Sequence, residues 1–139
     1  MLGAPRANAK CPCHSGLTFA DCCAPYLNSK ACPWRPEALM RSRYTAYTLA
    51  KISYIRATQV GPAAESFDSK TAIQWAKSCN WRGLCVDLDQ STAEFWQQDS
   101  AYVVFTAKFK QGDEFKQIHE RSLFKRIAGK WYYYYAPIE

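Results

Sequence analysis

The sequence predicts a small α+β protein, and three features of its 139 residues support that fold class. Five of the seven cysteines fall within the first 32 residues, which indicates a short N-terminal unit built around them. Apolar residues then recur at helical spacing from Glu37 to about Thr58. From Leu84 onward they alternate with polar residues, as in antiparallel strands. A cysteine unit, helices and an antiparallel meander, in that order, indicate the α+β class.

One long helix is expected over residues 37–58, because this stretch contains no glycine or proline. Pro36 suits the first position of that helix. A second helix is expected to run to about Cys79, with Asp68 or Ser69 as its cap.

Four strands are expected after the helices. Two-residue loops at Gly112-Asp113 and Ala128-Gly129 are expected to join the second strand to the third and the third to the fourth. The expected strands are residues 84–88, 101–110, 115–127 and 130–136.

Composition and charge exclude several classes of protein. Hydrophobic residues make up 48% of the chain and charged residues 22%, a balance that excludes long disorder. No apolar run approaches the roughly 18 residues of a membrane span, and Met1 to Lys10 lacks the apolar stretch of a secretory signal. We therefore expect a cytoplasmic protein with no membrane contact. The net charge of +6 is spread along the chain, so nucleic acid is not expected as a partner.

The chain is expected to divide into four segments. A flexible lead-in covers residues 1–10 and the cysteine unit covers residues 11–27. Residues 28–36 form a linker, because its prolines interrupt regular structure. The main domain covers residues 37–139.

The cysteine unit is expected to bind one structural zinc ion through Cys11, Cys13, Cys22 and Cys23. Two close pairs separated by a short loop can supply the four soft ligands that zinc takes in a tetrahedron. Four thiolates leave no open position, so a catalytic metal is not expected. The alternative is a set of free thiols or a vicinal disulfide.

Two spare donors lie near these cysteines. His14 and Cys32 could each replace a ligand, but we expect both to be bystanders.

Residues 11–23, CPCHSGLTFADCC, resemble the SEC-C motif, the zinc-binding element at the C-terminus of the SecA translocation ATPase. The cysteine spacing matches in full, and Phe19 stands at the aromatic position. His14 stands where the motif has glycine. Because the similar SecA tail binds the SecB chaperone and ribosomes, the resemblance implies a protein partner for the zinc unit.

Three further blocks, ALMRSRYTAY at 38–47, HERSLF at 119–124 and GKWYY at 129–133, are similar to the YchJ family of bacterial proteins. The resemblance implies a nuclear-transport-factor-2-like (cystatin-like) main domain. In that fold a curved antiparallel sheet packs on a long helix and leaves a conical pocket. The resemblance implies no established activity.

The hairpin loops set a register that places a carboxylate on the apolar face of the sheet. Glu120 and Ser122 then lie among apolar residues and near Tyr133. A carboxylate there is costly unless it is paired or lines a cavity. Glu120 therefore either forms a buried ion pair with Arg41 or Arg43, or serves a pocket as a ligand anchor or an acid/base group. The pocket candidates are Glu120, Ser122, Tyr133, Arg41, Arg43 and Tyr44.

The opposite face of the sheet is basic and rich in tyrosine. It could be solvated, could bind nucleic acid or could pair with a second copy of the chain, and we favour a homodimer. This register puts the following residues there: Lys108, Lys110, His119, Arg121, Lys125, Tyr132 and Tyr134.

Two functions remain open. The first is a protein-interaction module in which the zinc unit docks on a partner and the pocketed domain is a scaffold. The alternative is an enzyme or small-molecule binder that uses the pocket around Glu120. The chain lacks a phosphate-binding glycine loop and the common nucleophile motifs, so we assign no catalytic residue and favour a non-enzyme.

Five large aromatic side chains are expected in the core or the pocket wall: Tyr44, Tyr47, Trp75, Trp81 and Trp96.

Overall fold

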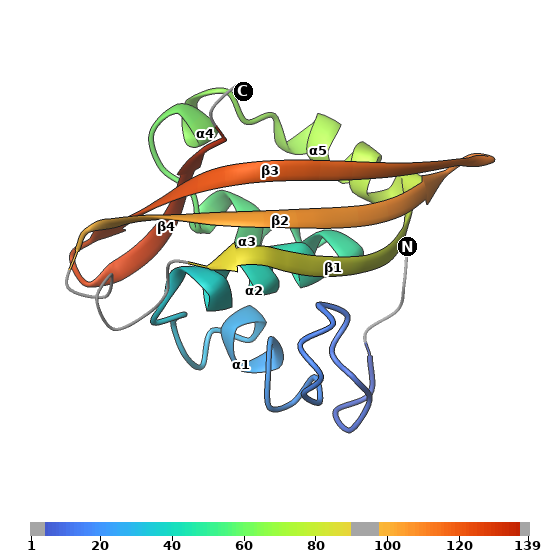
Figure 1. The fold of residues 1–139 in the computed structure, drawn as a ribbon, viewed down its shortest axis with the longest axis horizontal. Helices are drawn as coiled ribbons and strands as arrows, with labels where there is room; N and C mark the ends of the chain where they lie inside the picture. The colour runs from blue at the N-terminus through green and yellow to red at the C-terminus, as the bar shows by residue number, and fades with distance from the viewer. Residues whose placement is uncertain (1–4, 90–97, 137–139) are drawn as a thin grey trace.

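The protein is a four-stranded antiparallel sheet with helices against one face and the cysteine unit below them (Figure 1). The computed structural model describes residues 5–89 and 98–136, and Trp96 lies outside them. The elements in chain order are α1 (Ala24–Leu27), α2 (Pro36–Thr48), α3 (Ile52–Ala57), α4 (Pro62–Glu65), α5 (Ser69–Ser78), β1 (Cys79–Asp89), β2 (Ser100–Gln111), β3 (Glu114–Ile127) and β4 (Lys130–Tyr135).

The sheet is a meander with strand order β1-β2-β3-β4, as expected. The register of β2 on β3 is confirmed, since Phe105 lies opposite Glu120. The register of β3 on β4 is confirmed only near the turn. An irregularity after Leu123 places that residue, rather than Ser122, opposite Tyr135, so the expected pair there is wrong. A bulge inserts one residue on one strand and shifts every pair beyond it.

Strand β1 begins five residues earlier than expected. The register shifts between Trp81 and Gly83, and Gly83 adopts a φ of +147°. The irregularity breaks the period-two pattern in this part of the strand, and that pattern was the signal by which the strand was predicted.

The expected long helix is wrong in its second half, because α2 ends at Thr48 and a separate helix, α3, follows. Ala50 has a φ of +54°, a left-handed conformation that ends the first helix and turns the chain. The turn lets Ile52 and Ile55 of α3 bury their side chains. Helix α5 begins as predicted, since the Asp68 carboxylate accepts a hydrogen bond from the Thr71 backbone N–H at 3.2 Å.

The cysteine unit packs on the main domain. Cys11, Cys13 and Cys23 belong to the same buried cluster as Leu39 and Tyr44 of α2. Figure 1 shows the unit directly beneath α2 and β1. The four-cysteine cluster and the sheet therefore share one core through α2.

Within the described residues, no helix is both long and apolar enough to cross a bilayer.

Candidate functional site

Four cysteine side chains converge at the N-terminal unit. The sulfur atoms of Cys11, Cys13, Cys22 and Cys23 all lie within 4.8 Å of one another. Cys22 Sγ is 3.6 Å from Cys13 Sγ and 3.8 Å from Cys23 Sγ. All seven cysteines of the chain are free thiols, and the cluster is one that could hold a metal ion.

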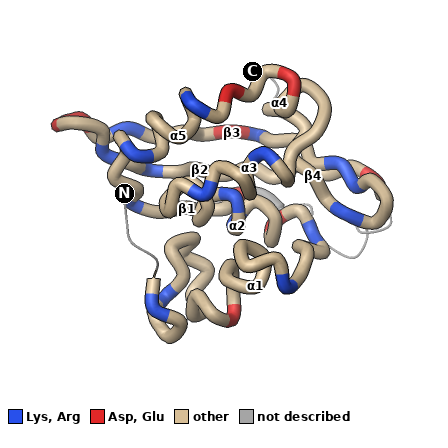
Figure 2. Tube along the Cα trace, turned by 180° about the vertical axis from the view of Figure 1, so that it is seen from behind, with Lys and Arg blue, Asp and Glu red and all other residues tan. Residues whose placement is uncertain are grey.

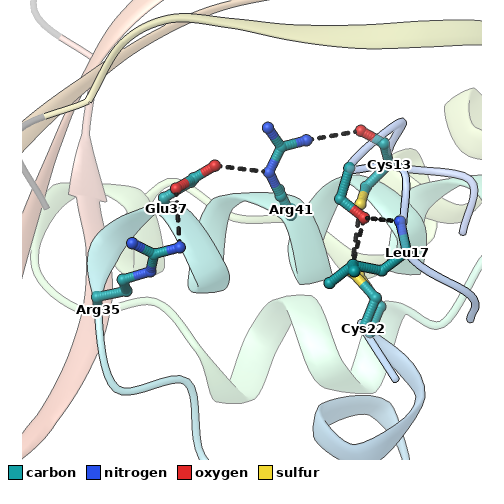
Figure 3. Close-up of polar contacts among 8 residues, drawn as sticks. Cys13, Leu17, Cys22, Arg35, Glu37 and Arg41 are labelled. Atoms are coloured by element: carbon teal, nitrogen blue, oxygen red, sulfur yellow. Dashed lines mark hydrogen bonds and ion pairs between the residues drawn. The ribbon is translucent and has the colours of Figure 1, made fainter. Parts of the chain in front are cut away.

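A tight turn brings the two pairs of cysteines together. His14 has a φ of +61° and Gly16 a φ of +92°, so the chain reverses directly after Cys13. His14 thus occupies a left-handed conformation that glycine adopts without strain. The Ser15 hydroxyl accepts a hydrogen bond from the Leu17 backbone N–H and lies 3.2 Å from Cys22 Sγ (Figure 3).

The thiols share protons unequally. Hydrogen bonds from Cys11, Cys22 and Cys23 lower the pKa of Cys13. Hydrogen bonds that Cys22 and Cys23 make to Cys11 and Cys13 raise the pKa values of both Cys22 and Cys23. Four thiolates at this separation repel one another, so ionising the whole cluster requires a cation to replace the retained protons.

Helix α2 contacts the cluster directly. Thr45, fully buried, donates a hydrogen bond to Cys23 Sγ at 3.4 Å, and its hydroxyl lies 3.8 Å from Cys11 Sγ. Arg41 donates to the backbone oxygen of Cys13 at 2.9 Å and pairs with Glu37 at 2.8 Å. Figure 3 shows Arg41 pointing to the cysteine unit. The expectation that Arg41 lines the pocket or pairs with Glu120 is therefore not supported by its position.

The two spare donors lie apart from the four thiols. The His14 ring packs over Gly83 of β1, where a Cβ would come within 2.5 Å of its Cε1 atom. Cys32 is exposed. The cluster of side chains that could hold a metal ion includes neither His14 nor Cys32.

A cavity of about 150 Å³ lies between α2, α5 and the sheet. Arg43, Tyr44, Glu120 and Tyr133 from the predicted set line it. Ser122 is fully buried beside it and donates a hydrogen bond to Glu120 Oε2 at 3.2 Å. The other lining residues are Met40, Tyr47, Trp75, Trp81, Phe105, Ala107 and Ile118.

Arg43 is the most deeply buried charge of the cavity. Its guanidinium donates to the backbone oxygen of Ile55, to Thr58 Oγ1 and to Gln59 Oε1, at 2.8 to 3.1 Å. It also stacks on the Tyr133 ring, with 4.6 Å from Cζ to the ring centroid. Among the described residues no carboxylate lies within 4.0 Å of it, so the expected Glu120–Arg43 contact pair is absent there.

Glu120 shares the cavity with Arg43 without touching it. Burial raises the pKa of the Glu120 carboxyl, while the Ser122 hydrogen bond and the positive charge of Arg43 oppose that shift. Burial also raises the pKa of Tyr133 to about 12, so its hydroxyl stays protonated at neutral pH.

A larger groove of about 870 Å³ adjoins this cavity along α4, α5 and β4. Four residues line both spaces: Arg43, Tyr47, Trp75 and Tyr133. Arg43 therefore lies at the boundary between the enclosed cavity and the open groove, whereas Glu120 lines only the cavity.

The outer face of the sheet carries cationic and aromatic side chains in contact. The Arg121 guanidinium lies 3.5 Å from the Tyr102 ring centroid, and Lys125 lies 4.2 Å from that of Tyr134. His119 is exposed there and its Nδ1 is 2.8 Å from Thr106 Oγ1. Figure 2 shows Lys and Arg spread over the sheet, the helices and the N-terminal unit.

Helical spacing could have placed some residues of the two sites, but not all of them. Thr45 lies four residues after Arg41, so helical spacing alone would have put both on the face toward the cysteines. Met40 and Tyr47 lie three residues before and four residues after Arg43 on the same face of α2, and they line the same cavity. Gln59 contacts Arg43 only because the chain turns after α2, and no pattern in the neighbouring sequence predicts that turn.

Two family models match the chain. A model described as SEC-C motif matches residues 8–25, and one described as YchJ, middle NTF2-like domain matches residues 35–136. A UPF0225 protein of Actinobacillus succinogenes is 42% identical over 132 residues, covering 94% of this chain and 83% of its own length. One of Geobacter sulfurreducens is 36% identical over 124 residues, covering 88% and 75%.

Two solved structures share the fold. A SEC-C motif containing protein from Rhodopseudomonas palustris, solved in solution, superposes with a TM-score of 0.81 at 35% identity, covering 93% of this chain and 98% of its own. A crystal structure of such a protein from Psychrobacter arcticus gives 0.77 at 28% identity, covering 96% and 85%. The NTF2-like fold with its N-terminal SEC-C unit is thereby confirmed.

Proposed function

The chain belongs to the YchJ family, and we propose that it is a zinc protein whose single structural ion lets the N-terminal unit serve as a protein-interaction module on a pocketed scaffold. The observation that carries the metal assignment is the geometry of the four sulfur atoms. Zinc takes four thiolates at about 2.3 Å, and a tetrahedron of that size has sulfur–sulfur edges of about 3.8 Å. Two of the edges measure 3.6 and 3.8 Å.

The surroundings of the cluster suit a structural ion. Cys11, Cys13 and Cys23 are buried, and Thr45 supplies a hydroxyl donor to the sulfur of Cys23. Bound zinc would hold the four thiolates and keep the unit against α2. Seven free thiols suit a reducing compartment, so we place the protein in the cytoplasm.

Two exposed apolar side chains support a protein partner at this unit. Leu17 is 53% exposed and Trp34 is 57% exposed, and both line a groove of about 340 Å³ that reaches Cys22. Exposed apolar side chains that share one groove are typical of docking surfaces. A partner would cover them beside the metal.

Cys13→Ser tests the metal assignment, with Cys32→Ser as the matched control. Elemental analysis and native mass spectrometry of freshly reduced wild type should give one zinc per chain. The Cys13 variant should lose the ion and the Cys32 variant should keep it, because Cys13 belongs to the four-cysteine cluster and Cys32 does not. A metal-free wild type, or equal loss in both variants, would refute the proposal.

A second experiment tests the interaction surface. Leu17→Ser and Trp34→Ala should each reduce the amount of partner protein that the full chain captures, while Phe115→Ser should not. Phe115 is 75% exposed but lies at the β2–β3 hairpin, away from the metal unit. Equal retention by all three variants would count against a docking role for this unit.

The cavity around Glu120 supports a second candidate function, a small-molecule site or an enzyme. The observation that favours it is that Arg43 is buried and that no carboxylate among the described residues lies within 4.0 Å of it. Native mass spectrometry that finds a small molecule retained by the folded chain and released by acid would support it. A chain that retains nothing and binds none of a panel of small molecules would exclude it.

A further inference from the structure

The charge balance of the cavity selects the sign of its ligand. A carboxyl can lose its charge by taking a proton, and burial favours this for Glu120. An arginine stays protonated at any pH at which a protein folds. The charge left uncompensated when Glu120 is protonated is therefore positive, and it belongs to Arg43.

Two buried polar atoms close to Arg43 or its cavity lack a partner among the described residues, and both are hydrogen-bond donors. Three of the five N–H groups of Arg43 bind Ile55, Thr58 and Gln59, which leaves two without a partner in the described structure. Trp81 lines the cavity, and its buried Nε1–H has no hydrogen-bond partner. Gln59 lines the adjoining groove, and its buried Nε2 also has no partner. Trp81 is 9% exposed and Gln59 is 6% exposed. Buried donors without acceptors are costly, so this region favours an acceptor-rich anion.

The walls select the shape of the ligand. Trp75 and Trp81 meet edge to face at 5.1 Å, and Tyr44 and Tyr47 pack against Trp81 in the same aromatic cluster. A cavity of about 150 Å³ is the size that accepts a benzene ring. Flat aromatic walls around such a space favour an aromatic ring over a branched or extended chain.

We propose that the cavity binds a small aromatic carboxylate, with its carboxylate on Arg43 at the groove boundary and its ring among Tyr47, Trp75 and Trp81. A hydroxyl or amine on the ring would donate to Glu120. This inference rests on the second candidate function above, and it adds the chemical class of the ligand. The adjoining groove leaves room at Arg43 for the ligand to enter and for a longer acid to extend.

Matched probes test the assignment on the full zinc-loaded chain by calorimetry. The three probes share a benzene ring and differ in charge: benzoate is an anion, benzyl alcohol is neutral and benzylammonium is a cation. Because benzoate brings an opposite charge into contact with the buried Arg43 and benzyl alcohol does not, benzoate should bind about tenfold or more tighter than benzyl alcohol. The three hydroxybenzoate isomers then test the donor, and at least one should bind tighter than benzoate.

Two variants locate the binding. Ala107→Leu fills part of the cavity without removing a polar group and should abolish binding of every probe. Glu120→Gln keeps a neutral side chain of the same size, so benzoate should bind at least as tightly as to the wild type, while the advantage of the best hydroxybenzoate shrinks. Circular dichroism melts identify variants that are folded, and Glu120→Gln is informative even if the leucine variant is unstable.

The outcomes separate the ligand class from the cavity's function. A preference for benzylammonium, or a retained native ligand that is not a carboxylate, would overturn the aromatic acid and keep the cavity as a small-molecule site. If no probe binds and no molecule is retained, both the ligand class and the second candidate function fail.

Discussion

Replacing Thr45 by valine should weaken zinc binding without emptying the core. Valine has nearly the same shape as threonine, so the change removes the hydroxyl and little else. In the wild type this hydroxyl donates to Cys23 Sγ at 3.4 Å and lies 3.8 Å from Cys11 Sγ. The side chain is fully buried, so water cannot supply the lost donor.

Two independent estimates of the effect agree. Losing an outer-shell hydrogen bond to a metal ligand costs about 10- to 100-fold in metal affinity, or about 1.4–2.8 kcal/mol. A hydrogen bond to a charged group contributes about 1.5–3 kcal/mol. We therefore expect the zinc dissociation constant of Thr45→Val to rise by about 10- to 100-fold.

A competition titration with a zinc chelator of known affinity measures this change. Thr48→Val is the matched control, because Thr48 is equally buried on the same helix but donates to the backbone oxygen of Thr45 at 2.7 Å. The control should keep wild-type zinc affinity. Unchanged affinity in Thr45→Val, or an equal loss in the control, would refute the role of Thr45.

Two further predictions concern stability. Burial raises the pKa of Glu120 above its ordinary value of 4.5, so the folded chain holds this proton more tightly than the unfolded chain. Stability should therefore fall as pH rises from 4.5 through the raised value, and Glu120→Gln should remove that part of the decline. Urea unfolding at several pH values measures it, and parallel profiles for the two proteins would contradict it. Gly83→Ala should lower the free energy of unfolding by about 1–3 kcal/mol, because the backbone there has a φ of +147° and the new Cβ would meet the His14 ring. An unchanged urea midpoint in that variant would show that this backbone is not strained.

The cluster of four cysteines and the central register of the sheet could be predicted because both depend on residues close together in the chain. Cys11 and Cys13, like Cys22 and Cys23, are neighbours before any folding occurs. The two-residue loop at Gly112-Asp113 sets which residues face each other, so Glu120 could be placed opposite Phe105. In the β3–β4 pair, which the Ala128-Gly129 loop sets, the same reasoning fails by one residue beyond the irregularity at Leu123.

The two arginines of α2 show where prediction stops. Residues two apart on a helix point about 200° away from each other, so Arg41 and Arg43 cannot share one pocket. Helical geometry separates them, but it does not say which faces the cysteine unit and which the cavity. That choice depends on the cysteine unit packing beneath α2 and on α3 turning back beside it.

The sequence by itself determined the fold class, the four candidate metal ligands and the carboxylate on the apolar face, because each follows from spacing within a few residues. Only the tertiary structure decided that the cysteine unit shares a core with the sheet, that Thr45 donates to a thiol and that Arg43 has no carboxylate in contact within the described chain. The physical reason is that a buried polar group takes its partners from elements brought together by packing, and these lie far apart in the sequence.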